Sequence, residues 1–410
     1  METILCRVFQ GGMKVGMCAI PWRMPETLEG PGAIRQLPAF IREKGNHHVL
    51  IVTDKSLMNL HLLDGMLEAM DAAQVAYTLY DNVTPNPTDV QVESGVAIYR
   101  KEQCDAIVAV GGGSPMDCAK GIAARIARPH KSVQQLQGVL RILRRVPNIY
   151  AVPTTAGTGS ETTIAAVITC VKDHHKASMN DISIMPRYAV LDPELTVGLP
   201  PHITATTGMD ALSHAVEAYT NNTYNTKLEK ELSRKAVKLI YDNLYTAYSD
   251  GTNLEARQNM QKAAFYAGRA FSRGSVGYVH AIGHALGGMY GTPHGVAMSA
   301  LLPLVMRQFG EAAHARLAEL CDVCGIVPAE QTDKAKAEAF LNWIEEMNEK
   351  MHVAKYPLQL ELQDIDQIAD WAHKEGNPLY PVPVVWSKAA FKQFLLDIHA
   401  KKQQSEPETI

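Results

Sequence analysis

Residues 106–126 read AIVAVGGGSPMDCAKGIAARI, an apolar run joined to a helical pattern through three consecutive glycines. A short apolar run that leads through glycines into a helical pattern is typical of a buried parallel strand, a tight turn and a crossover helix. Further apolar runs at 49–53 and 149–152 alternate with helical patterns such as 90–100. This alternation predicts βαβ units and a parallel sheet with helices on both faces.

The rest of the chain has a different pattern. From about residue 204 the strand-like runs fade, and helical patterns cover 207–219, 227–245, 254–270 and 311–323. Between the two parts stand Pro200 and Pro201, where no strand ladder can continue and where Pro201 disfavours a helical conformation of the residue before it. We therefore predict an α/β domain at residues 1–202, followed by an all-helical domain at residues 203–410.

Composition and charge exclude several functional classes. A chain of 410 residues is long enough for two or more domains. Its 39 Lys+Arg and 43 Asp+Glu give a net charge of -4, which speaks against nucleic acid as the main partner. No apolar run approaches the ~20 residues of a membrane-spanning helix, so no membrane partner is expected. Seven scattered cysteines suit a reducing compartment, which predicts a cytoplasmic protein.

Two glycine-rich loops follow two of the predicted strands. Gly111, Gly112 and Gly113 precede a helix, where backbone N–H groups and the helix dipole can stabilise a pyrophosphate. The loop matches neither the GxGxxG fingerprint nor the P-loop, so a simple tight turn is an equally good interpretation. The second loop reads PTTAGTGSE at residues 153–161. Loops after two strands of one parallel sheet converge at its carboxyl edge, where ligands of such sheets bind.

Asp54 follows the apolar run 49–53. A carboxylate at the end of such a strand can accept hydrogen bonds from ribose hydroxyls, and it would repel a 2′-phosphate, which favours NAD over NADP. An aspartate that caps the helix starting at the next residue explains the same position equally well.

Histidines and one aspartate are spaced as in a metal site. The segment HAIGHALGGMYGTPH starts at His280, ends at His294 and contains His284 four residues after its start. Upstream, Asp210 and His214 are also four residues apart, on one face of a predicted helix. Two such helices could surround one divalent ion, and mixed imidazole and carboxylate ligands suit Zn or Fe(II). Spacing leaves open which histidines bind, and an isolated pair of this kind is usually a surface contact.

Six motifs in a fixed order carry a resemblance to a known family. They read GGGSPMDCAK, PTTAGTGSE, DPELTVGLPP, TGMDALSHAVEAY, HAIGHALGG and GTPHGVAMSALLP. From about residue 30 to residue 307 the chain resembles the iron-dependent (group III) alcohol dehydrogenases. The resemblance implies an N-terminal Rossmann-like dinucleotide-binding domain and an all-helical metal-binding domain. It also implies a cleft between them for NAD and one divalent metal, usually Fe2+, with Zn2+ as the alternative.

The resemblance also assigns roles to residues of this chain. It implies four metal ligands, namely Asp210, His214, His280 and His294. It leaves His284 as a catalytic residue beside the nicotinamide and the substrate, and we interpret it as a proton relay. The implied cofactor-binding residues are Asp54, Asn86, Gly112, Gly113, Ser114, Thr154, Thr155, Thr158, Lys176 and Leu195.

The function expected from these assignments is NAD-dependent interconversion of a small primary alcohol or diol and its aldehyde, by a homo-oligomer of two or more chains. Arg269 and Arg273 stand where the family commonly has Met and Asn, and such a pair could hold a substrate carboxylate. A dehydrogenase of a hydroxy acid such as 4-hydroxybutyrate is therefore a second candidate, although a surface or subunit-interface pair is the simpler interpretation. We also consider a lyase similar to dehydroquinate synthase and a non-catalytic NAD-binding protein.

Overall fold

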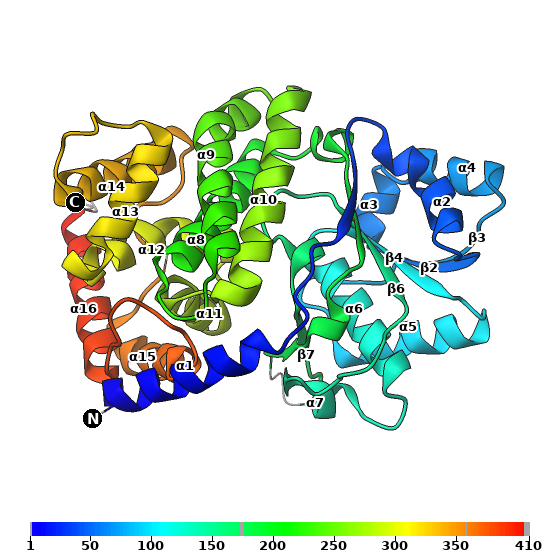
Figure 1. Cartoon of the computed structure of the whole chain (residues 1–410), viewed down its shortest axis with the longest axis horizontal. Coiled ribbons are helices and arrows are strands. Elements are labelled where there is room, and N and C mark those ends of the chain that lie inside the picture. Colours follow the sequence, from blue (N-terminus) through cyan, green and yellow to red (C-terminus); the bar gives the residue numbers. More distant parts are fainter. Residues whose placement is uncertain (1, 173–175, 358, 406–410) are drawn as a thin grey trace, which may run out of the picture. The chain divides into compact units, whose positions relative to one another are not determined.

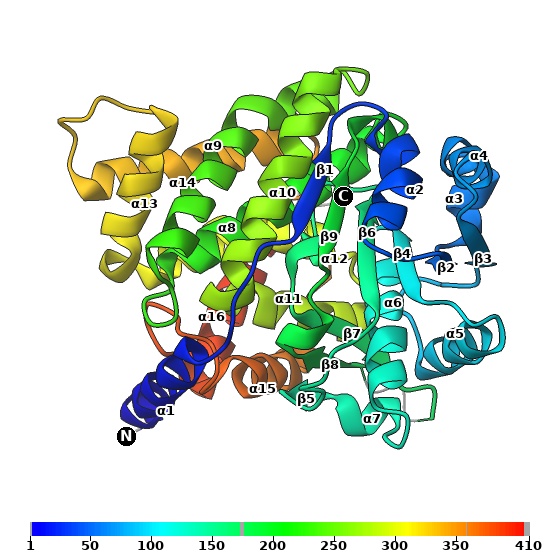
Figure 2. The same ribbon diagram turned by 45° about the vertical axis from the view of Figure 1, so that its right-hand side comes forward.

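The computed structural model describes residues 2–172, 176–357 and 359–405. The chain forms two compact units. Figures 1 and 2 show the whole chain coloured along its sequence, from blue at the N-terminus to red at the C-terminus. The sheet unit comprises Ile20–Leu199 and Gly251–Ser272, and the helical unit comprises Met1–Ala19, Pro200–Asp250 and Arg273–Ile410. The units thus follow a boundary at residue 199, but residues 1–19 belong with the helices and most of one later helix belongs with the sheet.

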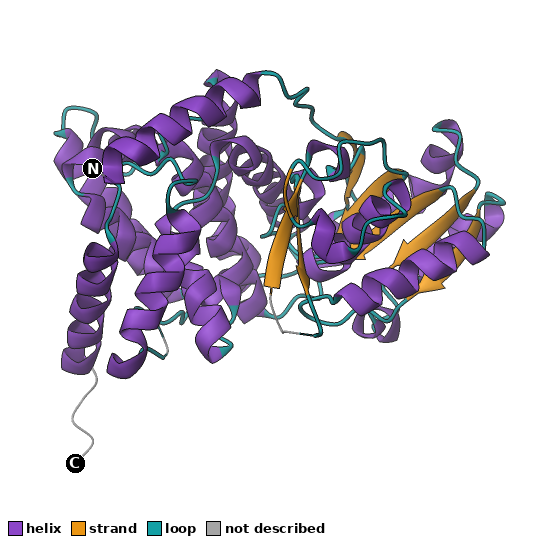
Figure 3. Cartoon of the chain, turned by 90° about the horizontal axis from the view of Figure 1, so that it is seen from below, coloured by secondary structure: helices purple, strands orange, loops and turns teal. Residues whose placement is uncertain are grey.

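A six-stranded parallel sheet forms the centre of the sheet unit, as the sequence predicted. Its strand order is β1-β9-β6-β4-β2-β3. The strands are β1 (Glu26–Glu29), β2 (His48–Val52), β3 (Ala76–Tyr80), β4 (Ala106–Gly111), β6 (Asn148–Pro153) and β9 (Tyr188–Leu191). Figure 3 shows these strands in orange among the helices of the same unit.

Alternate residues of the central strands face two separate cores. Leu50 of β2 and Ile107 of β4 belong to the core that also contains residues of α5 (Asp89–Lys101) and α6 (Gly113–Ala127). Their neighbours in the chain face the other core, which contains residues of α2 (Ala33–Glu43) and α4 (Asp64–Ala72). Because side chains alternate across a strand, a strand buried on both faces needs the continuous apolar runs seen in this sequence.

The remaining elements of the sheet unit are short, apart from one helix. A small sheet has the order β5-β8-β7, with β5 (Gly138–Val139), β7 (Ala165–Thr169) and β8 (Lys176–Asn180). The short helices are α3 (Lys55–Asn59), α7 (Val133–Leu136), η1 (Ser160–Thr162), η2 (Ile182–Ile184) and η3 (Pro193–Thr196). The long helix α10 (Leu254–Gly274) reaches the carboxyl edge of the main sheet, where Gln261 Nε2 donates to the carbonyls of Asp192 (3.0 Å) and Pro153 (3.3 Å).

The helical unit contains no described strand. Its elements are α1 (Glu2–Cys18), α8 (Pro201–Thr220), α9 (Lys227–Ser249), α11 (Tyr278–Tyr290), α12 (His294–Phe309), α13 (Glu311–Cys324), α14 (Asp333–Lys350), η4 (Leu362–Asp364), α15 (Ile365–Gly376) and α16 (Lys388–Ser405). Helix α8 packs against α9, α12 and α13 and is buried along most of its length. Among the described helices, none has both the length and the apolarity needed to cross a membrane.

Two helices start earlier than the sequence predicted. Helix α8 begins at Pro201 rather than near residue 207, because proline is well suited to the first position of a helix, where its missing N–H has no intrahelical acceptor. Helix α6 begins at Gly113, although all three glycines of the loop were expected to precede the helix. The loop between strand and helix is therefore shorter than expected, and Gly112 is the N-cap residue.

Candidate active site

Four side chains of the helical unit converge on one point. Asp210 and His214 lie one turn apart on α8, His280 lies in the first turn of α11, and His294 is the first residue of α12. One ligand atom from each residue lies within 4.8 Å of every other. A divalent ion with bonds of about 2.0 to 2.2 Å separates opposite ligands by roughly 4 Å, so this set needs little adjustment to hold one.

The cluster has the polar chemistry of a metal site rather than of an ion-pair network. Asp210 Oδ1 and His280 Nε2 are buried atoms without a hydrogen-bond partner among the described residues. The nearest imidazole nitrogen to Asp210 Oδ1 is His294 Nε2 at 3.2 Å, followed by His280 Nε2 at 3.8 Å. A buried carboxylate and a buried imidazole nitrogen that both lack partners destabilise a fold unless a cation compensates them. The donor set therefore fits a divalent metal.

The protonation states also favour metal binding. Burial lowers the pKa of His214 to about 3 and holds the pKa of His280 well below its usual range. Burial alone would raise the pKa of Asp210, but His214 and His294 hold it well below the ordinary aspartate value. Neutral imidazoles and an ionised carboxylate are the forms that bind metals, so these ligands need not release protons near neutral pH.

Glu217 is the hydrogen-bond partner of one of the ligands. It lies within the motif TGMDALSHAVEAY, but no role was predicted for it. Its buried carboxylate accepts hydrogen bonds from His280 Nδ1 at 2.5 Å and from the backbone N–H of Val279 at 2.7 Å. A carboxylate on Nδ1 fixes the ring tautomer and leaves Nε2 free to bind a metal. Glu217 lies seven residues after Asp210, so helical spacing from the Asp210–His214 pair was a signal that could have found it.

His284 lies beside the four ligands and has partners of its own. Its ring centroid is 5.3 Å from that of His294 and 5.7 Å from that of His280. Its Nδ1 lies 2.7 Å from Glu375 Oε1 of α15, and the same oxygen accepts a hydrogen bond from the Tyr380 hydroxyl at 2.8 Å. The His284 side chain is 42% exposed, in contrast to the buried His280. No sequence pattern pointed to Glu375, because it lies 91 residues from His284.

The two glycine-rich loops meet in the sheet unit. The Thr154 N–H donates to the Gly111 carbonyl at 3.1 Å. A Cβ atom on Gly112 would lie 3.5 Å from Thr155 Oγ1, and one on Gly113 would lie 3.4 Å from Thr158 Cγ2. Since Gly113 and Ser114 form the first turn of α6, their N–H groups have no acceptor within the helix. The loops therefore combine free backbone donors with threonine hydroxyls at the carboxyl edge of the sheet.

A buried charged network around Asp117 shapes the second loop, in agreement with the sequence-based interpretation that this residue orients the adjacent loops. Asp117 of α6 accepts hydrogen bonds from the Ser160 hydroxyl at 3.1 Å and from the Val167 N–H at 3.0 Å. Lys120 Nζ donates to Ser160 Oγ at 2.9 Å and to Thr163 Oγ1 at 2.8 Å. These contacts hold the second loop against α6.

The other expected cofactor residues lie on separate elements of the sheet unit. Asp54 caps α3, because its Oδ1 accepts from the N–H groups of Ser56 (2.8 Å) and Leu57 (3.1 Å). The Lys176 ammonium of β8 donates to Asn86 Oδ1 at 2.9 Å. Leu195 of η3 is buried in the core that also contains Val110 of β4 and Val152 of β6. Asp54 therefore caps a helix, as one of its two interpretations predicted. Its other carboxylate oxygen, Oδ2, has no hydrogen-bond partner among the described residues.

Arg269 and Arg273 have structural partners, contrary to the idea that they hold a substrate carboxylate. Arg269 is 2% exposed, donates from Nε to the Arg23 carbonyl at 3.1 Å and lies 5.4 Å from the centroid of the Trp22 ring. Arg273 Nε donates to the Tyr224 carbonyl at 3.2 Å. Each guanidinium group donates from its Nε to the protein backbone, so the structure gives these arginines a structural role and adds no support for a hydroxy-acid substrate.

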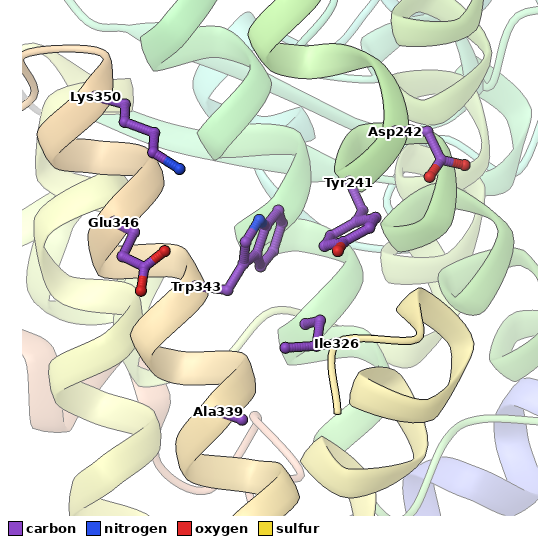
Figure 4. A pocket seen from close by; sticks show the side chains of 7 residues that line it. All are labelled: Tyr241, Asp242, Ile326, Ala339, Trp343, Glu346 and Lys350. Atoms are coloured by element: carbon purple, nitrogen blue, oxygen red, sulfur yellow. The ribbon is translucent and has the colours of Figure 1, made fainter. Parts of the chain in front are cut away.

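The helical unit also has an open pocket that does not include the metal cluster (Figure 4). It is lined by Tyr241, Asp242, Ile326, Ala339, Trp343, Glu346 and Lys350. The rings of Tyr241 and Trp343 lie 5.1 Å apart, and the charged residues around them carry both signs. This mixture favours no particular ligand, so chemistry rather than pocket size identifies the candidate site.

Comparisons with known proteins point to one family. Residues 25–193 match the model of the iron-containing alcohol dehydrogenases, and residues 204–395 match the C-terminal model of the Fe-containing alcohol dehydrogenase family. The chain is 38% identical over 353 residues to a 1,3-propanediol dehydrogenase of Klebsiella pneumoniae, covering 85% of this chain and 90% of the relative. It is 38% identical over 361 residues to alcohol dehydrogenase 4 of Schizosaccharomyces pombe, covering 87% and 84%.

A solved structure also resembles this chain in fold. The crystal structure of sulfoacetaldehyde reductase from Bifidobacterium kashiwanohense in complex with NAD+ superimposes with a TM-score of 0.82 and 28% sequence identity. The superposition covers 93% of this chain and 99% of the other.

Proposed function

This chain belongs to the iron-containing alcohol dehydrogenase family, and we propose on that premise that Asp210, His214, His280 and His294 hold one Fe2+ ion, with Zn2+ as the alternative. The chain is an oxidoreductase that interconverts an alcohol or diol and its aldehyde. The observation that carries the metal proposal is the pair of buried ligand atoms, Asp210 Oδ1 and His280 Nε2, that have no hydrogen-bond partner among the described residues.

We propose NAD as the redox cofactor. The NAD+ complex of the related sulfoacetaldehyde reductase supports this choice. Free N–H groups at the start of α6 suit a diphosphate, and Asp54 Oδ2 suits a ribose while repelling a 2′-phosphate. The proposed contacts are Asp54, Asn86, Gly112, Gly113, Ser114, Thr154, Thr155, Thr158, Lys176 and Leu195.

The chemistry divides between the bound groups and the residues around them. A metal held by Asp210, His214, His280 and His294 would supply a Lewis acid for the alcohol oxygen, and a nicotinamide held by the glycine-rich loops would supply the hydride acceptor. Glu217 holds the His280 ring with its Nε2 facing Asp210, so the ligand geometry exists before the substrate arrives. Asp210, His214 and His280 are buried, whereas the His294 side chain is 41% exposed, so the cluster faces solvent only at His294.

His284 is the proposed proton relay. With its Nδ1 proton donated to Glu375, the ring can accept the proton that the alcohol releases during oxidation at Nε2, and return it during aldehyde reduction. The exposed part of the ring provides a path for that proton to solvent. Glu375 and Tyr380 do not contact the reacting atoms in this scheme; they position His284.

We further propose a small primary alcohol or diol as the substrate, which the 1,3-propanediol dehydrogenase relative supports. The seven cysteines are all free thiols, which supports a reducing cytoplasmic environment. We also propose that the protein is a homo-oligomer, because of its family resemblance. We further propose two folding domains, at residues 1–202 and 203–410.

Metal analysis combined with kinetics tests these assignments. The His280→Ala variant should lose both bound metal and NADH formation from 1,3-propanediol, whereas the His284→Ala variant should keep the metal and turn over slowly. A metal-free His284→Ala protein would contradict the division between ligand and relay. Net reduction of NAD during turnover distinguishes this function from a lyase, in which the cofactor returns to its starting state.

A further inference from the structure

A second pocket, in the sheet unit, has only one sign of charge. Its lining includes Arg23, Arg144, Arg145 and Arg187, together with Ser183, around a cavity of about 200 Å3. We call these five residues the arginine pocket. Neither the glycine-rich loops nor any of the proposed cofactor contacts line it.

The arginine pocket lies at the edge of the sheet opposite to the cofactor loops. Arg144 and Arg145 precede β6, Arg187 directly precedes β9, and Arg23 precedes β1. These three strands are neighbours in the order β1-β9-β6 and run parallel, so their amino ends lie together. The loop at residues 153–161 instead follows the carboxyl end of β6. A strand of six residues is roughly 20 Å long, which separates the two sites.

The four arginines have no acidic partner among the described residues. Within that part of the chain no ion pair involves any of them, and the three that are solvent-exposed, at positions 144, 145 and 187, make no side-chain hydrogen bond. The nearby carboxylate of Asp181 accepts instead from the backbone N–H groups of Ile142 (2.8 Å), Leu143 (3.0 Å) and Ser183 (2.9 Å). Like charges gathered in one place repel each other, and an anion relieves that repulsion.

Arg23 is the most constrained member of the pocket. Its Nη2 donates to the Met185 carbonyl, while its Nε is buried and has no partner among the described residues. Burial and the neighbouring Arg187 lower the pKa of its guanidinium. A buried N–H without an acceptor costs free energy that an incoming oxygen atom would recover.

Buried contacts hold the pocket in place before any ligand arrives. Arg269 donates to the Arg23 carbonyl and lies over the Trp22 ring, which fixes the chain on one side. Asp181 ties residues 142–143 to η2 on the other side. The backbone segments that carry the arginines are therefore held in place, while the exposed side chains at positions 144, 145 and 187 can adjust to a ligand.

We propose that the arginine pocket binds a small multivalent oxyanion of the phosphate class. Planar guanidinium groups pair with phosphate oxygens through two parallel hydrogen bonds, and several of them favour a di- or trivalent ion over a single carboxylate. The Ser183 hydroxyl supplies a further donor. The ligand is either a free phosphate compound or the headgroup of a phospholipid, because both present the same oxygens.

Calorimetric titration of the full-length, metal-loaded protein with inorganic pyrophosphate tests the proposal. The titration is run with saturating NAD, so that the diphosphate loop is already occupied, and at about 0.15 M salt, where long-range attraction is screened. We expect saturable binding to one site, and at least about a tenfold loss of affinity in the Arg144→Ala/Arg145→Ala variant. The Arg23→Met variant should show a similar loss, and because binding is read without turnover, the result is independent of the proposed dehydrogenase function.

The matched control removes two positive charges elsewhere. Arg100→Ala/Lys334→Ala changes two exposed cations, on α5 and α14, that have no described partner. Its affinity for pyrophosphate should stay within about twofold of the wild type. Equal losses in the two double variants, or no saturable binding in the wild type, would overturn the proposal.

Vesicles separate the two sources of phosphate. The protein is sedimented with vesicles of phosphatidic acid and, as a control, with vesicles of phosphatidylcholine. If it sediments only with phosphatidic acid, and the Arg144→Ala/Arg145→Ala variant does not, the pocket binds a lipid headgroup. Pyrophosphate binding without sedimentation supports a soluble ligand. Sedimentation that the variant retains, together with no binding of pyrophosphate, contradicts the assignment.

Discussion

The metal cluster and the glycine-rich loops solve the same problem, binding a charged ligand, in opposite ways. In the cluster, Asp210 Oδ1 and His280 Nε2 have no hydrogen-bond partner among the described residues. Around the loops, the expected binding side chains already have internal partners, as Asp54 and Lys176 show. Buried atoms without a hydrogen bond depend on the ligand, whereas side chains held by internal hydrogen bonds keep their positions without one, even though the loops still offer free N–H groups. Substitutions in the cluster should therefore have larger effects than those near the loops.

The largest effect is expected from removing the carboxylate of the cluster. Asp210→Ala should abolish metal binding and lower kcat/KM by about a thousandfold or more, since Lewis-acid stabilisation contributes several kcal/mol. Elemental analysis and an NADH assay on the same preparation measure both. Glu311→Ala, at an exposed position on α13, is the control and should match the wild type. An active, metal-free Asp210→Ala enzyme would contradict the conclusion that the cluster depends on its metal.

The next effect tests the support behind the cluster. Glu217→Gln keeps the size of the side chain but removes the charge that faces His280 Nδ1, so metal affinity should fall about 10- to 100-fold. Competition with a chelator gives the affinity, and Glu231→Gln, on the exposed face of α9, is the control. If the variant and the wild type release metal at the same chelator concentration, Glu217 has no role in orienting the ligand.

A smaller effect is expected where the residue acts through His284. Glu375→Gln should lower kcat by about tenfold, with metal content and KM unchanged, because it disturbs a proton relay rather than binding. Tyr380→Phe removes only the outer hydrogen bond to the same carboxylate and should cost less. A change confined to KM in Glu375→Gln would assign this residue to substrate binding instead.

The smallest effect is expected at the loops. Asp54→Asn retains an oxygen that can cap α3, so its thermal unfolding should be unchanged. Loss of the negative charge should raise the KM for NAD only a few-fold, to about three to ten times the wild-type value, and should improve the use of NADP. Kinetics with both cofactors measure the ratio. A cofactor preference identical to that of the wild type would remove Asp54 from the proposed ribose contact.

Sequence patterns predicted the elements well and their partners poorly. Periodicity is local, and so the strands at 106–110 and 149–152 and the helices at 227–245 and 311–323 were found within a few residues of their observed bounds. The pairing of His280 with Glu217 joins residues 63 apart in the chain, and no periodic pattern spans that interval. The arginine pocket was missed for the same reason, because its members come from three separate segments.

The sequence by itself determined a parallel α/β part, a helical part, and, through the resemblance of its motifs, the four candidate ligands. Apolar runs and helical spacing are patterns of a few consecutive residues, and so both can be recognised in the sequence. Only the tertiary structure decided that α1 belongs with the helical unit and most of α10 with the sheet. It also decided that Arg269 supports Arg23 instead of facing a substrate. These choices depend on which distant side chains can satisfy a buried charge, and that is settled only when the chain is packed.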